Sequence, residues 1–365
     1  MNRTQPCYPS GIMRSIYLVV LFLVTAVVGL GQTATSAAPD LPKEPREVFA
    51  KAAPLYDLGA ASLKPWYLKA AYQLYDEKGD AAERGTYEYW WASPQVYRET
   101  WSRPSGTHTD WHIADGKHAS QSTGEPLKFF EHTLREKLLS PLPDDSDLDA
   151  AKYRLDRENV TLGSVKYPCI MVIPLMPQHG MVQAVPLGLF PTYCFDPHMP
   201  VLRISYSFGT LITDFNKIVK MQDKYLAREI NLFEGKRKIL SATVDSVTGL
   251  SVADPALQPP ANVPVSEAKR VTFAGAVAQG LLIKKQIPIY PEDAKQARVS
   301  GTVVLRAIIG IDGAIHQLHV VSAPWPSLAA SSLQSVSHWQ YKPCRFNGEL
   351  VEVETTVNVV FSLSD

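Results

Sequence analysis

The residues whose types and spacing could do chemistry gather in one short segment, where His108, Asp110 and His112 alternate and His118 follows. Alternate residues of a β-strand face the same side, so two imidazoles and a carboxylate could converge there on a divalent metal. The segment is also polar and rich in turn residues, which is typical of a solvated hairpin. We favour the hairpin, and we predict no metal site and no cofactor.

Sequence signatures of catalysis are missing from the rest of the chain. No Gly-x-Ser-x-Gly, His-Glu-x-x-His or phosphate-cradling glycine loop occurs. No pair of carboxylates stands in an apolar setting that would shift a pKa. We therefore predict no catalytic residues and expect a binding protein rather than an enzyme.

Length and charge limit the classes of protein to consider. The chain has 365 residues, enough for two domains that each bury a core. Its 36 basic and 36 acidic residues give a formal net charge of zero, which argues against a nucleic-acid partner. An apolar content of 45% is ordinary for a globular protein and excludes one with many membrane spans.

The N-terminus carries a targeting pattern. Arg3 and Arg14 precede an apolar run over residues 16–30, and small and polar residues follow it. A basic start, a short apolar stretch and a small-residue exit are typical of a secretory signal. The run is shorter than the roughly 20 residues of a spanning helix, although a retained inner-membrane anchor stays possible. We expect residues 1–31 to be a signal or short anchor, and the protein to be periplasmic.

The cysteines beyond the apolar run are Cys169, Cys194 and Cys344. An exported protein meets oxidising conditions, so one pair could be bonded. Cys169 and Cys194 lie in the same apolar, proline-rich block and form the best candidate pair. The alternative is that both are small buried hydrophobic residues.

The middle of the chain predicts a β-rich domain over residues 55–250, between a tether (32–54) and a proline-rich linker (251–282). Aromatic runs from Trp66 to Trp101 alternate in polarity and are divided by Gly and Pro turns, which indicates an antiparallel meander. A helical period within residues 125–139 puts Leu127, Leu134 and Leu138 on one face.

This meander resembles the half-barrel of periplasmic lipoprotein-carrier (LolA-like) proteins. The resemblance rests on a strand, a Ser-Pro turn and a Tyr-Arg pair over residues 91–98, followed by Asp115-Gly116. It implies a sheet curled round an apolar cavity under a helix, with a lipid as a possible ligand. The alternative is a solid aromatic core that binds nothing.

The last segment, residues 283–365, predicts a second, smaller domain. A helix follows Pro291 and ends before Gly301, and a strand then runs to Asp312-Gly313, a two-residue hairpin turn. A return strand, an amphipathic helix that ends near Trp339 and a final alternating strand complete it. We expect a three-stranded antiparallel sheet with two helices, so the fold class of the chain is α+β.

This segment resembles the C-terminal domain of the TonB energy-transducer family. The matching motifs, in order, are Tyr290-Pro291, Ala297-Arg298 with Gly301, Asp312-Gly313, Val320-Val321-Ser322, and Trp339, Tyr341 and Pro343. The resemblance implies β-augmentation, in which an extended receptor segment pairs with the edge of the last strand. It assigns partner binding to Gln286 and Tyr290 in the entry segment of the domain and to the edge strand, with Val351, Val353, Thr355, Val357, Val359 and Phe361.

Two functions follow as alternatives. The first is a TonB-family periplasmic protein that binds extended segments of outer-membrane receptors, or of other envelope proteins, and supports TonB-dependent transport. The second is a periplasmic lipid or lipoprotein carrier with a TonB-like docking domain. The apolar run at residues 16–30 has no histidine and no charge, so coupling to the proton-driven motor of the inner membrane stays open.

Overall fold

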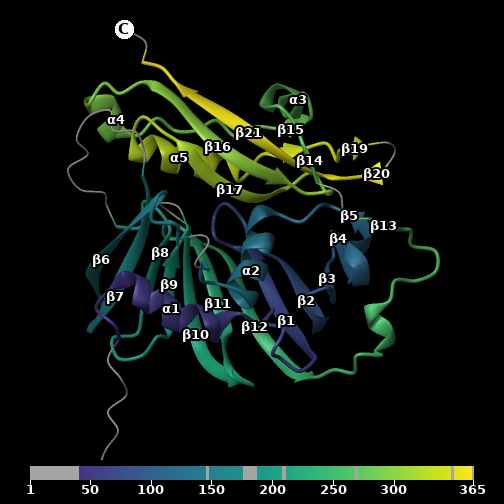
Figure 1. Ribbon diagram of the computed structural model, residues 1–365. Helices are drawn as coiled ribbons and strands as arrows, with labels where there is room; N and C mark the ends of the chain where they lie inside the picture. Colours follow the sequence, from purple (N-terminus) through teal and green to yellow (C-terminus); the bar gives the residue numbers. More distant parts are fainter. Residues whose placement is uncertain are drawn as a thin grey trace, which may run out of the picture. The chain divides into compact units, whose positions relative to one another are not determined.

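The computed structural model describes residues 41–144, 148–175, 187–207, 211–267, 270–346 and 349–363 (Figure 1). These residues fall into one structural unit. The predicted signal or anchor, residues 1–31, lies outside the described residues. Among the residues that are described, no helix is long and apolar enough to cross a membrane.

The largest sheet is antiparallel, and among the described residues it has 13 strands in the order β13-β5-β4-β3-β2-β1-β12-β11-β10-β9-β8-β7-β6. Consecutive strands pair almost throughout, so the meander predicted from the sequence is present. The strands are β1 (Trp66–Tyr75), β2 (Ala81–Ser93), β3 (Val96–Arg103), β4 (Gly106–Ile113), β5 (Lys117–Gly124), β6 (Tyr153–Leu162), β7 (Val165–Pro174), β8 (Thr192–Phe195), β9 (Leu202–Tyr206), β10 (Leu211–Met221), β11 (Lys224–Glu234), β12 (Arg237–Gly249) and β13 (Val265–Glu267).

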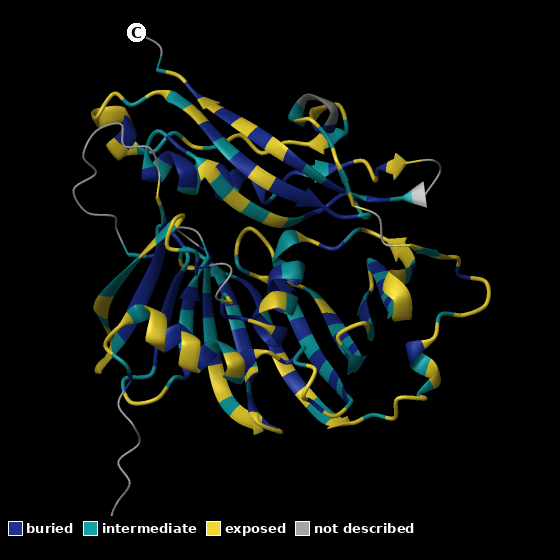
Figure 2. Cartoon of the chain, viewed as in Figure 1, coloured by how far each residue is buried: buried dark blue, intermediate teal, exposed yellow. Residues whose placement is uncertain are grey.

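Alternate side chains along the strands of this sheet are buried in the hydrophobic core. In β1 every second residue is buried, from Trp66 to Leu74, and the residues between them are half-buried (Figure 2). The same alternation buries Tyr87, Tyr89 and Trp91 of β2. Because side chains of a strand alternate between its two faces, this pattern gives the sheet one continuous apolar face.

Helix α1 (Pro45–Tyr56) corrects the prediction of a tether over residues 32–54 from residue 45 onward, and residues 32–40 lie outside the described part of the chain. Its residues Val48, Phe49 and Ala52 are buried, and the helix contacts β11. The hydroxyl of Tyr56 accepts a hydrogen bond from the backbone N–H of Leu202 at 2.7 Å. The Ala- and Pro-rich composition resembles that of a linker, so the helical spacing of the apolar residues was not recognised. The apolar face of the helix is stable because it packs against the sheet.

Helix α2 (Phe129–Leu139) also contacts β11 and begins four residues later than the predicted limit. Glu131 accepts a hydrogen bond from the backbone N–H of Lys128 at 2.8 Å, which satisfies a free donor at the start of the helix. Leu134 and Leu138 are buried as predicted, whereas Leu127 is buried outside the helix.

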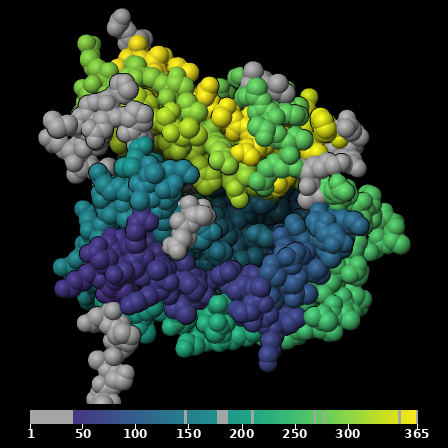
Figure 3. Space-filling model, viewed as in Figure 1, coloured from purple at the N-terminus to yellow at the C-terminus, as the bar shows by residue number. Residues whose placement is uncertain are grey.

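In the space-filling view the purple segment that includes α1 faces the viewer, and the surface is hollowed between the blue strands and the C-terminal segments (Figure 3).

A second sheet in the C-terminal region has the order β14-β21-β16-β17. Its strands are β14 (Arg270–Thr272), β16 (Gly301–Ile309), β17 (Ile315–Ser322) and β21 (Glu352–Phe361). Helix α5 (Pro326–Val336) packs on β16 and β17, and α4 (Glu292–Gln296) contacts α5. The α+β class is therefore confirmed, and β14 adds a short parallel strand to the three antiparallel strands that the sequence predicted.

The segment predicted as a linker, residues 251–282, contains short elements that pair with both sheets. β13 pairs with β5, and β14 pairs with β21. The indole N–H of Trp111 donates at 3.1 Å to the carbonyl of Ala256, which lies in a 3-10 turn (Pro255–Leu257). The remaining short elements are the 3-10 turn Ala114–Gly116, α3 (Gly275–Gln279), β15 (Leu282–Lys284), β18 (Gln340–Tyr341), β19 (Arg345–Phe346) and β20 (Glu349–Leu350).

Candidate functional site

The outer edge of β21 is free over only part of its length. On one side, β16 pairs with it from Val353 to Phe361. On the other side, β14 pairs with Glu352–Glu354, and the N–H of Phe273 donates to the carbonyl of Glu354 at 2.9 Å. The backbone of Gly275 in α3 then lies against the carbonyl of Thr356. The prediction of an unpaired edge from residue 351 is therefore wrong for the first part of the strand. Within the described part of the chain, no strand pairs with the outer edge at residues 357–361.

The side chains assigned to partner binding on this strand point into the protein. All six are buried, namely Val351, Val353, Thr355, Val357, Val359 and Phe361. The alternate residues Thr356, Asn358 and Val360 are exposed. A partner strand would therefore meet the backbone edge and these exposed side chains, while the buried set holds β21 in place.

The two residues assigned to partner binding in the entry segment of the domain have different surroundings. Tyr290 is half-buried, donates its hydroxyl to the carbonyl of Val299, and packs edge-on against Phe361 with ring centroids 5.2 Å apart. The side chain of Gln286 is exposed, and its carbonyl accepts a hydrogen bond from the indole of Trp339 at 2.8 Å. Tyr290 thus stabilises the domain, and the side chain of Gln286 stays accessible.

A cavity of about 500 Å³ lies beside α2 and β17. Its apolar lining includes Phe129, Leu142, Phe190, Tyr193, Leu318 and Val320, and Lys137 and Glu136 line it as well. A volume of this size lies within the range of small-molecule sites. The half of the sheet with β1–β3 has instead a filled aromatic core, in which Tyr87 and Trp101 lie 4.0 Å apart between ring centroids.

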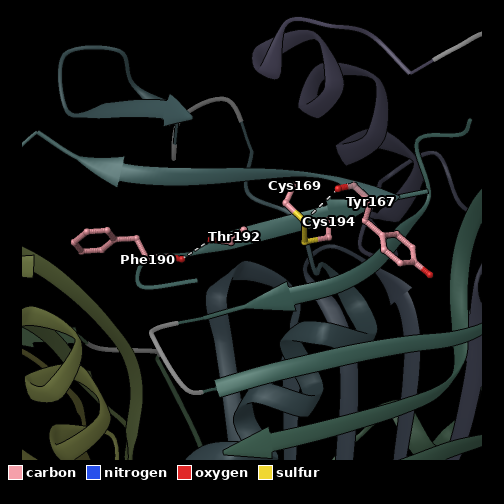
Figure 4. Close-up of a disulfide and its surroundings, with 5 residues drawn as sticks. All are labelled: Tyr167, Cys169, Phe190, Thr192 and Cys194. Atoms are coloured by element: carbon pink, nitrogen blue, oxygen red, sulfur yellow. Dashed lines mark hydrogen bonds between the residues drawn. A yellow bond between two sulfur atoms is a disulfide. The ribbon is translucent and has the colours of Figure 1, made fainter. Parts of the chain in front are cut away.

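A disulfide joins Cys169 and Cys194, the pair that the sequence singled out (Figure 4). The two residues are direct partners across β7 and β8. Phe190, which lines the cavity, accepts a hydrogen bond through its carbonyl from the Thr192 hydroxyl at 2.8 Å. The disulfide thus joins two strands that contribute residues to the cavity wall, while Cys344 is free and buried.

The histidine-rich hairpin does not gather its side chains around a common point. His108 Nε2 lies 2.5 Å from the carbonyl of Glu125, and Asp110 accepts a hydrogen bond from Ser120. His112 stacks on Tyr97 with 4.0 Å between centroids. Burial raises the pKa of Asp110 to about 6 and lowers the pKa of His112 to about 4. Each of these three groups has its own partner within the protein.

A different cluster, which the sequence did not predict, unites His132 of α2 with Asp312 and His316. Within the described part of the chain, it is the one set of three metal-ligating side chains whose donor atoms lie within 4.8 Å of one another. Asp312 oxygens lie 3.4 Å from His132 Nε2 and 3.0 Å from His316 Nε2. Asp312 and His316 are four residues apart in one hairpin, whereas His132 is distant in the sequence, and only the packing of α2 against β17 brings it to them.

The loop between β16 and β17 positions Asp312. It is closed by a hydrogen bond from the N–H of Gly310 to the carbonyl of Ala314 at 2.9 Å, so the turn is longer than the predicted two-residue hairpin. Gly313 adopts a φ of 80°, a conformation that favours glycine. The N–H of Ala314 donates to Asp312 Oδ1 at 3.0 Å and orients the carboxylate.

The charges within the cluster follow from burial and proximity. Burial alone would raise the pKa of Asp312, but the two imidazoles hold that pKa well below its usual value. Burial lowers the pKa of His132, and the neighbouring His316 lowers it further. Burial opposes protonation of His316, yet Asp312 raises its pKa above the ordinary value. Near neutral pH the cluster therefore holds an ionised Asp312 and a neutral His132.

The described residues form an α+β protein with a large sheet and a smaller C-terminal sheet in which β21 is paired over only part of its outer edge. Residues 286–363 match the family described as Gram-negative bacterial TonB protein C-terminal, which confirms the resemblance found in the sequence. This match indicates a protein of the periplasmic cell envelope. No curated protein matches the chain.

Two solved structures are similar to the chain at low identity. A LolA superfamily protein from Nitrosomonas europaea has 7% identity and a TM-score of 0.37, over 59% of this chain and 97% of that one. A DUF1329 family protein from Desulfovibrio piger has 9% identity and a TM-score of 0.36, over 60% of this chain and all of that one (100%). The first carries the name of the superfamily that the meander resembled. Likenesses with such low TM-scores do not bear on function.

Proposed function

We propose that this chain is an exported periplasmic protein that binds an extended segment of an envelope protein by β-strand addition. The partner that we favour is a TonB-dependent outer-membrane receptor, and the role is binding rather than catalysis. The observation that carries the proposal is the free outer edge of β21 at residues 357–361, in a segment that matches the TonB C-terminal family.

Backbone geometry identifies the groups that a partner would meet. Because the carbonyl of Glu354 accepts a bond from Phe273, the backbone groups of even-numbered residues in β21 point away from β16. The N–H and C=O groups of Asn358 and Val360 therefore face outward. Each main-chain hydrogen bond contributes roughly 1 kcal/mol net, so these four groups support a weak, reversible contact.

Side chains beside this edge would add to the contact. Val360 is 69% exposed, which is high for a large apolar residue in a regular strand. A partner strand with an apolar residue opposite it would cover that surface and gain about 25 cal/mol for each Å² removed from water. The edge therefore favours an extended segment with alternating apolar residues.

Replacing one outward donor tests strand addition. Asn358→Pro removes the N–H that faces the partner and leaves the bonds to β16 in place. We expect this variant to bind a synthetic peptide from the periplasmic end of a TonB-dependent receptor at least about tenfold more weakly than the wild type. The control Asn358→Ala loses the same side chain, keeps the N–H, and should bind normally.

Fluorescence anisotropy with the labelled peptide measures this difference, and circular dichroism verifies that both variants are folded. Equal affinity of the proline variant and the wild type would contradict strand addition at β21. Wild-type protein that binds no receptor peptide would exclude the receptor as partner.

A second candidate function is lipid binding, favoured by the cavity of about 500 Å³ with its apolar lining. An acyl chain would contact Phe190, Leu318 and Val320, and Lys137 lies where an anionic head group could approach it. Mass spectrometry of lipids that co-purify with the full chain tests this candidate.

A matched pair of variants on β17 separates the cavity from the outer surface. Leu318→Trp fills the cavity and should reduce the co-purifying lipid to less than about a tenth. Val321→Trp enlarges a side chain on the same strand that is 57% exposed, and it should leave the lipid content unchanged. Lipid that is absent from the wild type, or equally present in both variants, would exclude this cavity as a lipid site.

A further inference from the structure

We propose that His132, Asp312 and His316 form a binding site for a divalent transition metal ion of the zinc type. Two imidazole nitrogens and one carboxylate oxygen are ligands that zinc, cobalt and nickel accept in proteins. A water molecule would complete a four-coordinate site. Side-chain exposures of 15–26% leave room for that water and a path for the ion.

The spacing of the donor atoms suits such an ion. Metal–ligand distances near 2.0–2.1 Å put the ligands of a tetrahedral site about 3.3 Å apart. Asp312 Oδ2 lies 3.4 Å from His132 Nε2, and Asp312 Oδ1 lies 3.0 Å from His316 Nε2, so each carboxylate oxygen faces one imidazole. One donor atom from each of the three residues lies within 4.8 Å of the other two. The ion would replace the hydrogen bond between His316 and Asp312.

The surroundings form a built pocket rather than a chance encounter of side chains. His132 Nε2 is buried and makes no hydrogen bond within the described part of the chain, although it lies near Asp312. A Cβ atom at Gly310 would come within 2.1 Å of the His316 ring and 2.7 Å of Asp312 Oδ1. The absence of a side chain at Gly310 therefore makes the space in which these two ligands meet.

Charge around the pocket also favours a cation. The carboxylates of Glu99, Asp110 and Glu352 are close enough to act electrostatically on the two histidines. Arg135, on the same helix as His132, is paired with Glu99 at 2.7 Å. The local field is thus dominated by negative groups that a bound ion would neutralise.

Metal binding would join two parts of the fold. His132 belongs to α2, which packs on the large sheet, whereas Asp312 and His316 belong to the hairpin of the small sheet. An ion held by both would stabilise their contact, because only the folded arrangement presents all three ligands.

Titration of the full chain with Co²⁺ after treatment with a chelator tests the site. We expect one equivalent to bind, with the visible absorption of tetrahedral cobalt, and competition by Zn²⁺. Saturation with Zn²⁺ should raise the thermal midpoint of unfolding. His132→Ala and His316→Ala should each weaken binding by at least about tenfold, because mutation of even an outer-shell partner of a ligand costs roughly 10–100-fold in metal affinity.

His198→Ala removes an exposed imidazole outside the cluster and should bind like the wild type. If an alanine variant does not fold, His316→Gln and Asp312→Asn replace it with little change in volume. Absence of a stoichiometric cobalt spectrum in the wild type would overturn the proposal. Equal binding by the wild type and all cluster variants would do the same.

Discussion

The close approach at Gly310 gives a quantitative test of how firmly the His132–Asp312–His316 cluster is packed. In Gly310→Ala the new Cβ would meet His316 Cε1 at 2.1 Å and Nε2 at 2.2 Å. Such distances are far below van der Waals contact, so either the imidazole or the loop must move. The imidazole is held by Asp312 at 3.0 Å and packs on the His132 ring at 3.9 Å between centroids.

The expected cost follows from two opposing effects. Overpacking a well-filled site costs about 1–3 kcal/mol of unfolding free energy. Because Gly310 does not have a positive φ, the lower backbone entropy of alanine in the unfolded chain returns about 0.4–1 kcal/mol. We therefore expect a net loss of about 1–2 kcal/mol for Gly310→Ala alone.

A double-mutant cycle isolates the contact between Gly310 and His316. In a His316→Ala background the two shortest contacts vanish, and Gly310→Ala should cost less than about 0.5 kcal/mol. The coupling energy between the two changes should then be about 1–2 kcal/mol. Urea unfolding of the four proteins, monitored by tryptophan fluorescence, measures each free energy.

Gly249 provides the matched control, since a Cβ there meets nothing within 4 Å and its φ is not positive. Gly249→Ala should change the stability by less than about 0.5 kcal/mol. The reasoning fails if Gly310→Ala costs the same with and without His316. In that case the imidazole moves aside freely, and the cluster is not a packed unit.

Three further predictions concern other parts of the large sheet. Burial lowers the pKa of His112 from 6.5 to about 4. Between pH 6.5 and about pH 4, His112 is therefore protonated in the unfolded chain and neutral in the folded protein. Stability is therefore lost as the pH falls through this window, and His112→Phe, which keeps a stacking ring, should remove about 2.5 kcal/mol of the loss between about pH 7 and pH 4.5 in chemical denaturation curves. Replacing Cys169 and Cys194 by serine, a pair 25 positions apart, should cost about 3 kcal/mol and abolish the effect of reductant on the thermal midpoint; a midpoint in the wild type that reductant leaves unchanged would contradict this. Glu131 is fully buried, pairs with Arg103 at 3.3 Å and accepts a hydrogen bond from the Tyr72 hydroxyl at 2.8 Å. Glu131→Ala should therefore cost about 3–5 kcal/mol of unfolding free energy. The control Glu158→Ala, at an exposed position of β6, should change that free energy by less than about 0.5 kcal/mol.

Local patterns predicted most of the fold. The alternation in β1 and the helical period of α2 could be predicted because strand and helix periods depend only on neighbouring residues. The tether prediction failed over α1 because its composition resembles a linker and its apolar face is narrow. The sequence did not predict β14, because a strand of three residues has too short a pattern and its pairing with β21 joins distant segments.

For the edge strand β21, the sequence predicted which residues share a face but not which part of the edge is unpaired. Its alternation predicted that one set of residues shares a face, and that set is buried. Which part of its edge is free depends on β14 and α3, which reach β21 from the segment before the domain. Sequence reasoning had no means of placing that segment, because hydrogen bonds between backbones carry little side-chain signal.

By itself, the sequence determined the α+β class, the strand meander, the TonB-like C-terminal segment and the pair of cysteines that the disulfide joins. These features rest on short-range periodicity, turn residues and an ordered set of motifs. The tertiary structure alone decided the extent of the free edge, the position of the cavity, and the meeting of His132 with Asp312 and His316. Such features depend on the packing of segments far apart in the chain, and no local pattern encodes which distant side chains share one pocket.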